Sequence, residues 1–138
     1  MKTILSLLFT LLIISACEKN SISSTLVGKW NPSYQYQSKN ADGSWGPWLT
    51  MNTLVAVVDM EFTADGRYLR GGQDGSVCCG PGSKYKVSED KVIFSDFKSC
   101  SNVYCISFCT EWIFTIIEDN NTLIVESCGS RSKFFRNR

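Results

Sequence analysis

The stretch VDMEFTADGRYLR, residues 58–70, decides the fold class of this chain of 138 residues. Apolar and polar side chains alternate over residues 58–63, which is the two-residue period of a half-buried strand. The apolar set is Val58, Met60 and Phe62. A short turn then ends on Gly66, a residue suited to positive φ, and residues 67–70 lead away from it. The stretch therefore predicts an antiparallel β-hairpin.

Strand patterns recur along the rest of the chain, and no stretch shows convincing helical periodicity. The further predicted strands are residues 30–37, 84–87, 92–94, 104–117, 123–128 and 131–135. Pro32 cannot donate a ladder hydrogen bond and predicts an edge or a bulge. Short strands joined mostly by tight turns in chain order favour an all-β fold, a small antiparallel up-and-down barrel of about eight strands. A Greek-key sandwich is the alternative.

The N-terminus has the pattern of a signal peptide, because Lys2 precedes an apolar run over residues 4–14 that is too short for the ~20 residues of a membrane-spanning helix. Residues 14–17, Ile-Ser-Ala-Cys, resemble the lipobox of bacterial lipoproteins. The resemblance implies that residues 1–16 are removed and that Cys17 is acylated. Ordinary cleavage after Ala16, which would leave Cys17 a free thiol, is the alternative.

This interpretation divides the chain into the signal peptide of residues 1–16, a flexible tether over residues 17–24 and a single domain over residues 25–138. Two or three acyl chains on Cys17 would hold the protein stably on a membrane. We therefore expect a lipid anchor in the cell envelope, with the outer membrane favoured and the domain facing the periplasm or the exterior.

Six cysteines remain when Cys17 is set aside, an even number that predicts three disulfides in an exported domain. They are Cys78, Cys79, Cys100, Cys105, Cys109 and Cys128. In an extended strand Cys105 and Cys109 would lie about 13 Å apart, so we expect them to bond elsewhere. A vicinal bond between Cys78 and Cys79 and a structural zinc site are weaker alternatives.

Charge and composition exclude several function classes. Without Lys2 the chain has 13 basic and 13 acidic residues, which argues against a nucleic-acid partner. The chain has no histidine, so no Ser-His or Cys-His nucleophile and no histidine-bound metal can form. Asp59 and Glu61 could act as paired carboxylates, but their apolar neighbours place them on the outer face. We expect no catalysis, no metal and no cofactor.

Residues 26–30, Leu-Val-Gly-Lys-Trp, resemble the G-x-W signature that opens the first strand of lipocalins. The segments that follow, a loop rich in Gly, Trp and Pro, residues 60–66 and residues 85–92, are similar in order to lipocalin-like domains of bacterial lipoproteins. The resemblance implies that Trp30, two residues after Gly28, closes the barrel floor. It also implies a basic residue packed across that ring near the last strand. Four residues compete for this role: Arg131, Lys133, Arg136 and Arg138.

An eight-stranded barrel can hold one small ligand, and the sequence supplies aromatic residues to line it. Strand parity selects Tyr34, Tyr36, Phe62, Phe108, Trp112 and Phe114 as candidates. We therefore expect a carrier of a small apolar ligand. The alternative is a filled barrel that binds proteins of the cell envelope through its loops, where Trp45 and Trp48 could form a lid or a contact patch.

Overall fold

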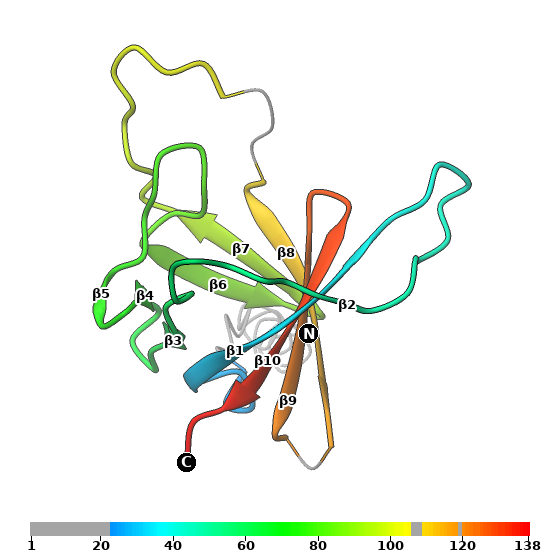
Figure 1. Cartoon of the computed structure of the whole chain (residues 1–138). Coiled ribbons are helices and arrows are strands. Elements are labelled where there is room, and N and C mark those ends of the chain that lie inside the picture. Colours follow the sequence, from blue (N-terminus) through cyan, green and yellow to red (C-terminus); the bar gives the residue numbers. More distant parts are fainter. Residues whose placement is uncertain (1–22, 106–108, 119) are drawn as a thin grey trace, which may run out of the picture.

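The computed structural model describes residues 23–105, 109–118 and 120–138, and its regular elements are all β-strands. They are β1 (Gly28–Ser38), β2 (Leu49–Thr50), β3 (Met60–Phe62), β4 (Tyr68–Arg70), β5 (Gln73–Asp74), β6 (Lys84–Ser88), β7 (Lys91–Ser95), β8 (Glu111–Ile117), β9 (Thr122–Ser127) and β10 (Ser130–Arg136). One antiparallel sheet has the order β5-β4-β3-β1-β10-β9-β8-β7-β6, and β2 pairs with β1 (Figure 1). Over these residues we find no helix that could span a bilayer.

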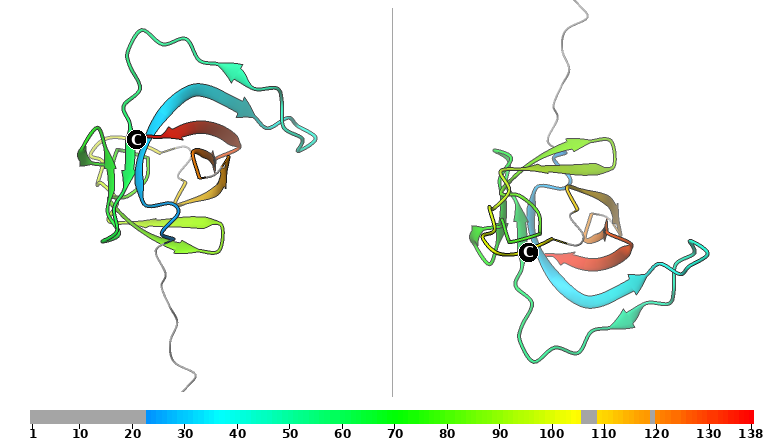
Figure 2. Two further views of the ribbon diagram at one scale, coloured as in Figure 1. Left: turned by 90° about the horizontal axis from the view of Figure 1, so that it is seen from below. Right: turned by 90° about the horizontal axis from the view of Figure 1, so that it is seen from above.

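Apart from the two-residue strands β2 and β5, the strands follow one another around the sheet in chain order. Strand β1 pairs with both β3 and β10 and so joins the first strands to the last. At the remaining seam, Tyr68 N–H donates to the Ser83 carbonyl and Tyr85 N–H donates to the Gly66 carbonyl, both at 2.8 Å. Seen from below and above, the sheet curls around an interior (Figure 2). The predicted all-β, antiparallel up-and-down barrel is confirmed.

The hairpin of residues 58–70 is present, with β3 and β4 as its arms. Its turn is closed by Thr63 N–H, which donates to the Arg67 carbonyl at 2.9 Å. Gly66 has a φ of 83°, the positive value expected for it. The first strand is shorter than predicted, because β3 begins at Met60 and leaves Val58 exposed.

The long strand β1 is interrupted where the sequence places a proline. Its register against β10 shifts between Pro32 and Tyr36, and Tyr34 within this bulge has a φ of 61°. The expectation of an edge or a bulge at Pro32 is met by a bulge. Such a bulge bends the strand and increases its twist, which helps a small sheet to curl.

The predicted strand over residues 104–117 is present from Glu111 to Ile117, whereas residues 104, 105, 109 and 110 are not in a strand and residues 106–108 lie outside the described residues. Strand β8 begins at Glu111. Cys105 lies in the loop before it and forms a disulfide with Cys79. Cys100, a little earlier in the same loop, is bonded to Cys78. The two disulfides tie this segment to the loop before β6, so the segment follows its covalent partners and does not extend β8.

The core is a cluster of aromatic rings between the strands. Phe62 lies 5.1 Å from Tyr85 and 5.3 Å from Tyr68, measured between ring centroids. Tyr68 also packs 5.5 Å from Trp112, and Trp112 packs edge-on against Phe94 at 4.6 Å. Edge-on pairs of this kind stabilise beyond their buried area, by about 0.5–1.5 kcal/mol each. These rings fill much of the interior and leave a smaller space for a ligand.

Candidate ligand cavity

One end of the barrel is closed by Trp30, which is fully buried. Its indole N–H donates to the Leu26 carbonyl at 2.9 Å, so the segment before β1 folds beneath the ring. The Arg136 guanidinium lies 4.2 Å over the ring. Arg136 also donates to the Val27 carbonyl at 2.9 Å and to the Asn120 carbonyl at 2.7 Å. Of the four basic residues that competed for this place, Arg136 occupies it.

Gly28 is part of this closure because a side chain there would displace the arginine. A Cβ atom built on Gly28 would lie 2.7 Å from Arg136 Nη1, and the glycine has a φ of 136°. Both features favour glycine. The first and third residues of the G-x-W segment therefore serve one contact, in which Gly28 leaves space and Trp30 supplies the surface.

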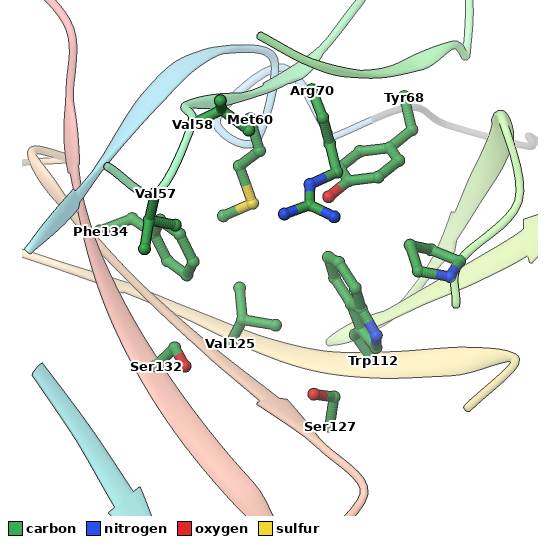
Figure 3. A pocket seen from close by; sticks show the side chains of 11 residues that line it. Val57, Val58, Met60, Tyr68, Arg70, Trp112, Val125, Ser127, Ser132 and Phe134 are labelled. Atoms are coloured by element: carbon green, nitrogen blue, oxygen red, sulfur yellow. The ribbon is translucent and has the colours of Figure 1, made fainter. Parts of the chain in front are cut away.

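A cavity of about 220 Å³ lies inside the barrel, between β3, β4, β8, β9 and β10 (Figure 3). Its apolar walls are Met60, Tyr68, Trp112, Val125 and Phe134, and Val57, Val58 and Pro81 line it from the loops. The cavity reaches the surface, because Val58 in its wall is exposed. Its volume exceeds the ~150 Å³ of an engineered apolar cavity that holds benzene and lies below the ~300 Å³ usual for drug-sized ligands.

Polar side chains enter the same cavity. Figure 3 shows the Arg70 guanidinium between Met60 and the Tyr68 ring, with Ser127 and Ser132 on the wall formed by β9 and β10. The Arg70 guanidinium and both hydroxyls lack a hydrogen bond or ion pair to any side chain or backbone group in the described part of the chain. The lining contains no acidic residue. The cavity thus offers hydrogen-bond donors without a carboxylate to neutralise its cation.

Tyr68 connects the cavity to the aromatic core. Burial raises the pKa of its phenol from 10.0 to about 12, and the nearby Arg70 charge lowers the pKa in part. The phenol therefore stays protonated at neutral pH and can donate a hydrogen bond. Its hydroxyl has no hydrogen-bond partner among the described residues.

The six predicted ligand-lining residues lie in different places. Trp112 lines the cavity, whereas Phe62 and Phe114 belong to the packed core or its edge. Tyr34 and Tyr36 lie at the bulge of β1 and do not line the cavity. Phe108 lies outside the described residues.

Sequence reasoning overlooked Arg70, although the sequence held a signal for it. In the hairpin of residues 58–70, Met60 and Phe62 face inward, and Phe62 pairs with Tyr68 while Met60 pairs with Arg70. Paired residues of an antiparallel sheet share a face, so Arg70 has the parity of a core residue. A charged residue at an inward position is the signal that could have identified it.

Trp45 and Trp48 form neither a lid nor an exposed patch. The loop after β1 folds over the outer surface of β10, where the Arg131 guanidinium lies 4.0 Å from the Trp45 ring centre. The Lys133 ammonium lies 4.5 Å from the Trp48 ring centre. Both tryptophans are half-buried by this cation–π packing, which contributes about 0.5–1 kcal/mol at exposed sites. The expectation for these residues is therefore corrected.

The six cysteines form three disulfides, as predicted: Cys78–Cys100, Cys79–Cys105 and Cys109–Cys128. Cys78, Cys79 and Cys100 have their sulfurs within 4.8 Å of one another, but each sulfur belongs to a disulfide and is not a thiolate ligand. Three disulfides in one small domain indicate an oxidising, extracytoplasmic environment.

Other candidate features lie on the outside of the barrel. Asp59 Oδ2 lies 3.2 Å from Lys29 Nζ, and Glu61 is the register partner of Lys29, so both carboxylates occupy the outer face. A second hollow, of about 280 Å³, is larger than the interior cavity but has the exposed Lys84 and Lys86 among its walls. The interior cavity is the better ligand site because it combines apolar walls with convergent polar groups.

Comparisons of this chain with protein-family models, curated proteins and solved structures give no match.

Proposed function

We propose that this protein is a lipid-anchored lipoprotein of the cell envelope that holds one small, largely apolar ligand in its barrel and performs no catalysis. The observation that carries the proposal is the cavity of about 220 Å³ between Met60, Trp112 and Phe134. Burial of apolar surface against such walls contributes roughly 25 cal/mol per Å². A ligand somewhat larger than benzene would bury most of its surface there.

The closed end supports a binding role over a channel. Trp30, Leu26 and the Arg136 guanidinium fill the barrel at that end, where the two apolar residues are fully buried. The interior therefore has a floor, and a ligand would enter from the opposite side, where the exposed Val58 borders the cavity. A closed floor and an accessible mouth fit a carrier of the lipocalin-like type.

Ligand binding can be tested by filling the cavity with a larger side chain. Ser132 lies half-buried in the cavity wall on β10, and Ser132→Leu would place an apolar side chain in the space that a ligand needs. Isothermal titration with a panel of small aromatic and branched compounds should show binding by the wild-type protein and none by Ser132→Leu. Thr115→Leu, on an exposed position of β8, is the matched control and should bind as the wild type does. No binding by the wild-type protein would overturn the proposal.

The proposal of a membrane anchor rests on the lipobox-like residues 14–17. It is supported by the extracytoplasmic environment that the disulfides indicate. Expression of the full-length chain in bacteria with a labelled fatty acid should give a labelled protein in the membrane fraction. Cys17→Ala should abolish the label. An unlabelled wild-type protein would show that the signal peptide is cleaved in the ordinary way.

A second candidate function is favoured by one observation. The loop between β2 and β3 leaves Leu54 and Val55 largely exposed, and the same loop supplies Val57 and Val58 to the cavity wall. Exposed apolar residues at a loop tip are typical of protein contact sites. A Leu54→Ser/Val55→Ser variant should lose recovery of a cross-linked envelope partner if the loop mediates contact, and unchanged recovery would exclude it.

A further inference from the structure

The cavity carries a charge that an apolar ligand alone would leave uncompensated. The Arg70 guanidinium points into it beside the Tyr68 ring (Figure 3), and no ion pair to Arg70 occurs in the described part of the chain. Two other arginines of the domain form ion pairs, Arg67 with Asp65 at 2.9 Å and Arg131 with Glu126 at 3.2 Å. Arg136 instead donates to backbone carbonyls beside the Trp30 ring. Arg70 is therefore an inward-facing cation whose guanidinium has neither a carboxylate nor a carbonyl acceptor among the described residues.

Donor groups surround the same space. Besides Arg70, the Tyr68, Ser127 and Ser132 hydroxyls face it or line it, and none has a hydrogen-bond partner within the described ranges. Arginine can only donate, and a guanidinium binds a planar carboxylate through two parallel hydrogen bonds. A partly desolvated cation surrounded by free hydrogen-bond donors has the chemistry that binds an anion.

We propose that the ligand is a small organic acid, whose carboxylate pairs with the Arg70 guanidinium while its apolar body packs between Met60 and Trp112. This inference rests on the proposed function, because it names the class of ligand for the same cavity. The volume of the cavity limits the size of this ligand. Scaled from the cavity that holds benzene, about 220 Å³ admits a body of roughly nine non-hydrogen atoms, which is the size of benzoate.

The experiment compares benzoate with benzamide, which has nearly the same shape and no charge. Titration into the protein purified from the full-length chain should show benzoate binding at least about ten-fold more tightly than benzamide, as expected for a hydrogen bond to a charged group. Arg70→Met keeps the length of the side chain and removes its charge. It should reduce the preference to less than about two-fold without weakening benzamide binding. Arg67→Met, on the same hairpin but exposed, is the matched control and should keep the preference.

The possible results distinguish a failure of the organic-acid inference from a failure of the proposed carrier function. Equal binding of benzoate and benzamide by the wild-type protein would overturn the organic acid and leave the apolar carrier standing. Absence of binding of either probe and of the wider compound panel would overturn both. If Arg70→Met does not fold, the preference of the wild-type protein for benzoate over benzamide still decides the point.

Discussion

The Arg136 guanidinium lies 4.2 Å over the buried Trp30 ring and joins the last strand of the barrel to the first. It is held there by hydrogen bonds to backbone carbonyls of Val27 and Asn120. The contact closes the floor of the interior. It also explains why the segment that opens β1 combines a glycine with a tryptophan, since Gly28 leaves the space in which the guanidinium lies.

Arg136→Met should lower the free energy of unfolding by about 2 kcal/mol, because it removes a cation–π contact and hydrogen bonds from a charged donor. Denaturant unfolding followed by tryptophan fluorescence measures the change. Arg138→Met, two residues further along at an exposed position, is the control and should change stability by less than about 0.5 kcal/mol. Equal effects of the two variants would contradict the role of Arg136.

Gly28→Ala should destabilise the fold by about 1–3 kcal/mol, because the added Cβ meets Arg136 Nη1 at 2.7 Å and the backbone has a positive φ. Gly43, with a φ of 84° and no atom within 4 Å of a built Cβ, separates the two causes. Gly43→Ala tests the backbone strain alone and should cost less. A larger loss for Gly43→Ala would show that the contact with Arg136 is unimportant.

The eight-strand order, the hairpin turn at Gly66 and the bulge near Pro32 were all predictable, because alternation, turn residues and proline act through local backbone chemistry. The cavity was less predictable from the sequence. Side-chain parity placed Phe62 and Trp112 inward correctly, but it could not tell which inward residue packs in the core and which borders a space. That distinction depends on how rings from distant strands meet, as Tyr68 meets Phe94 and Trp112.

The loop of residues 100–105 shows a different limit. Residues 104 and 105 were predicted to begin a strand, but disulfides from Cys100 and Cys105 to Cys78 and Cys79 hold this loop elsewhere. Six cysteines allow fifteen pairings, so no spacing rule selects the pairs. Covalent tertiary contacts overrode the local preference here.

Peptide mapping under non-reducing conditions should recover the pairs Cys78–Cys100, Cys79–Cys105 and Cys109–Cys128. A Cys109→Ser/Cys128→Ser variant should have a free energy of unfolding lower by about 2–4 kcal/mol, because the disulfide restricts the unfolded chain from just before β8 to just after β9. Recovery of a Cys78–Cys79 peptide would contradict the pairing.

Alkaline pH should destabilise the protein through Tyr68. Folding raises the pKa of this phenol from 10.0 to about 12, so the folded state holds the proton more tightly than the unfolded state does. The stabilisation is complete below pH 10 and is lost as the pH rises towards 12. Unfolding measured at several pH values should show this fall, with a smaller slope in Tyr68→Phe. The slope should not vanish, since burial raises the pKa of Tyr85 to about 12 as well. An unchanged slope in Tyr68→Phe would refute the assignment.

Ser132→Leu should stabilise the fold as well as block binding, because it fills part of a cavity lined by Val125 and Phe134. Cavity filling typically raises the free energy of unfolding by about 0.5–2 kcal/mol. Thermal unfolding of the variant beside Thr115→Leu measures the gain. A loss of stability with unchanged ligand binding would mean that the ligand does not bind beside Ser132.

Native mass spectrometry of the protein expressed from the full-length chain, recovered from the envelope in mild detergent, tests the central claim most directly. We predict a non-covalent adduct of about the mass of a small aromatic acid, lost on denaturation and absent from Arg70→Met and Ser132→Leu. Benzoate added to a ligand-free preparation should restore an adduct on the wild-type protein alone. A clean mass with three intact disulfides, unchanged by added benzoate or by the compound panel, would show that the barrel holds no ligand.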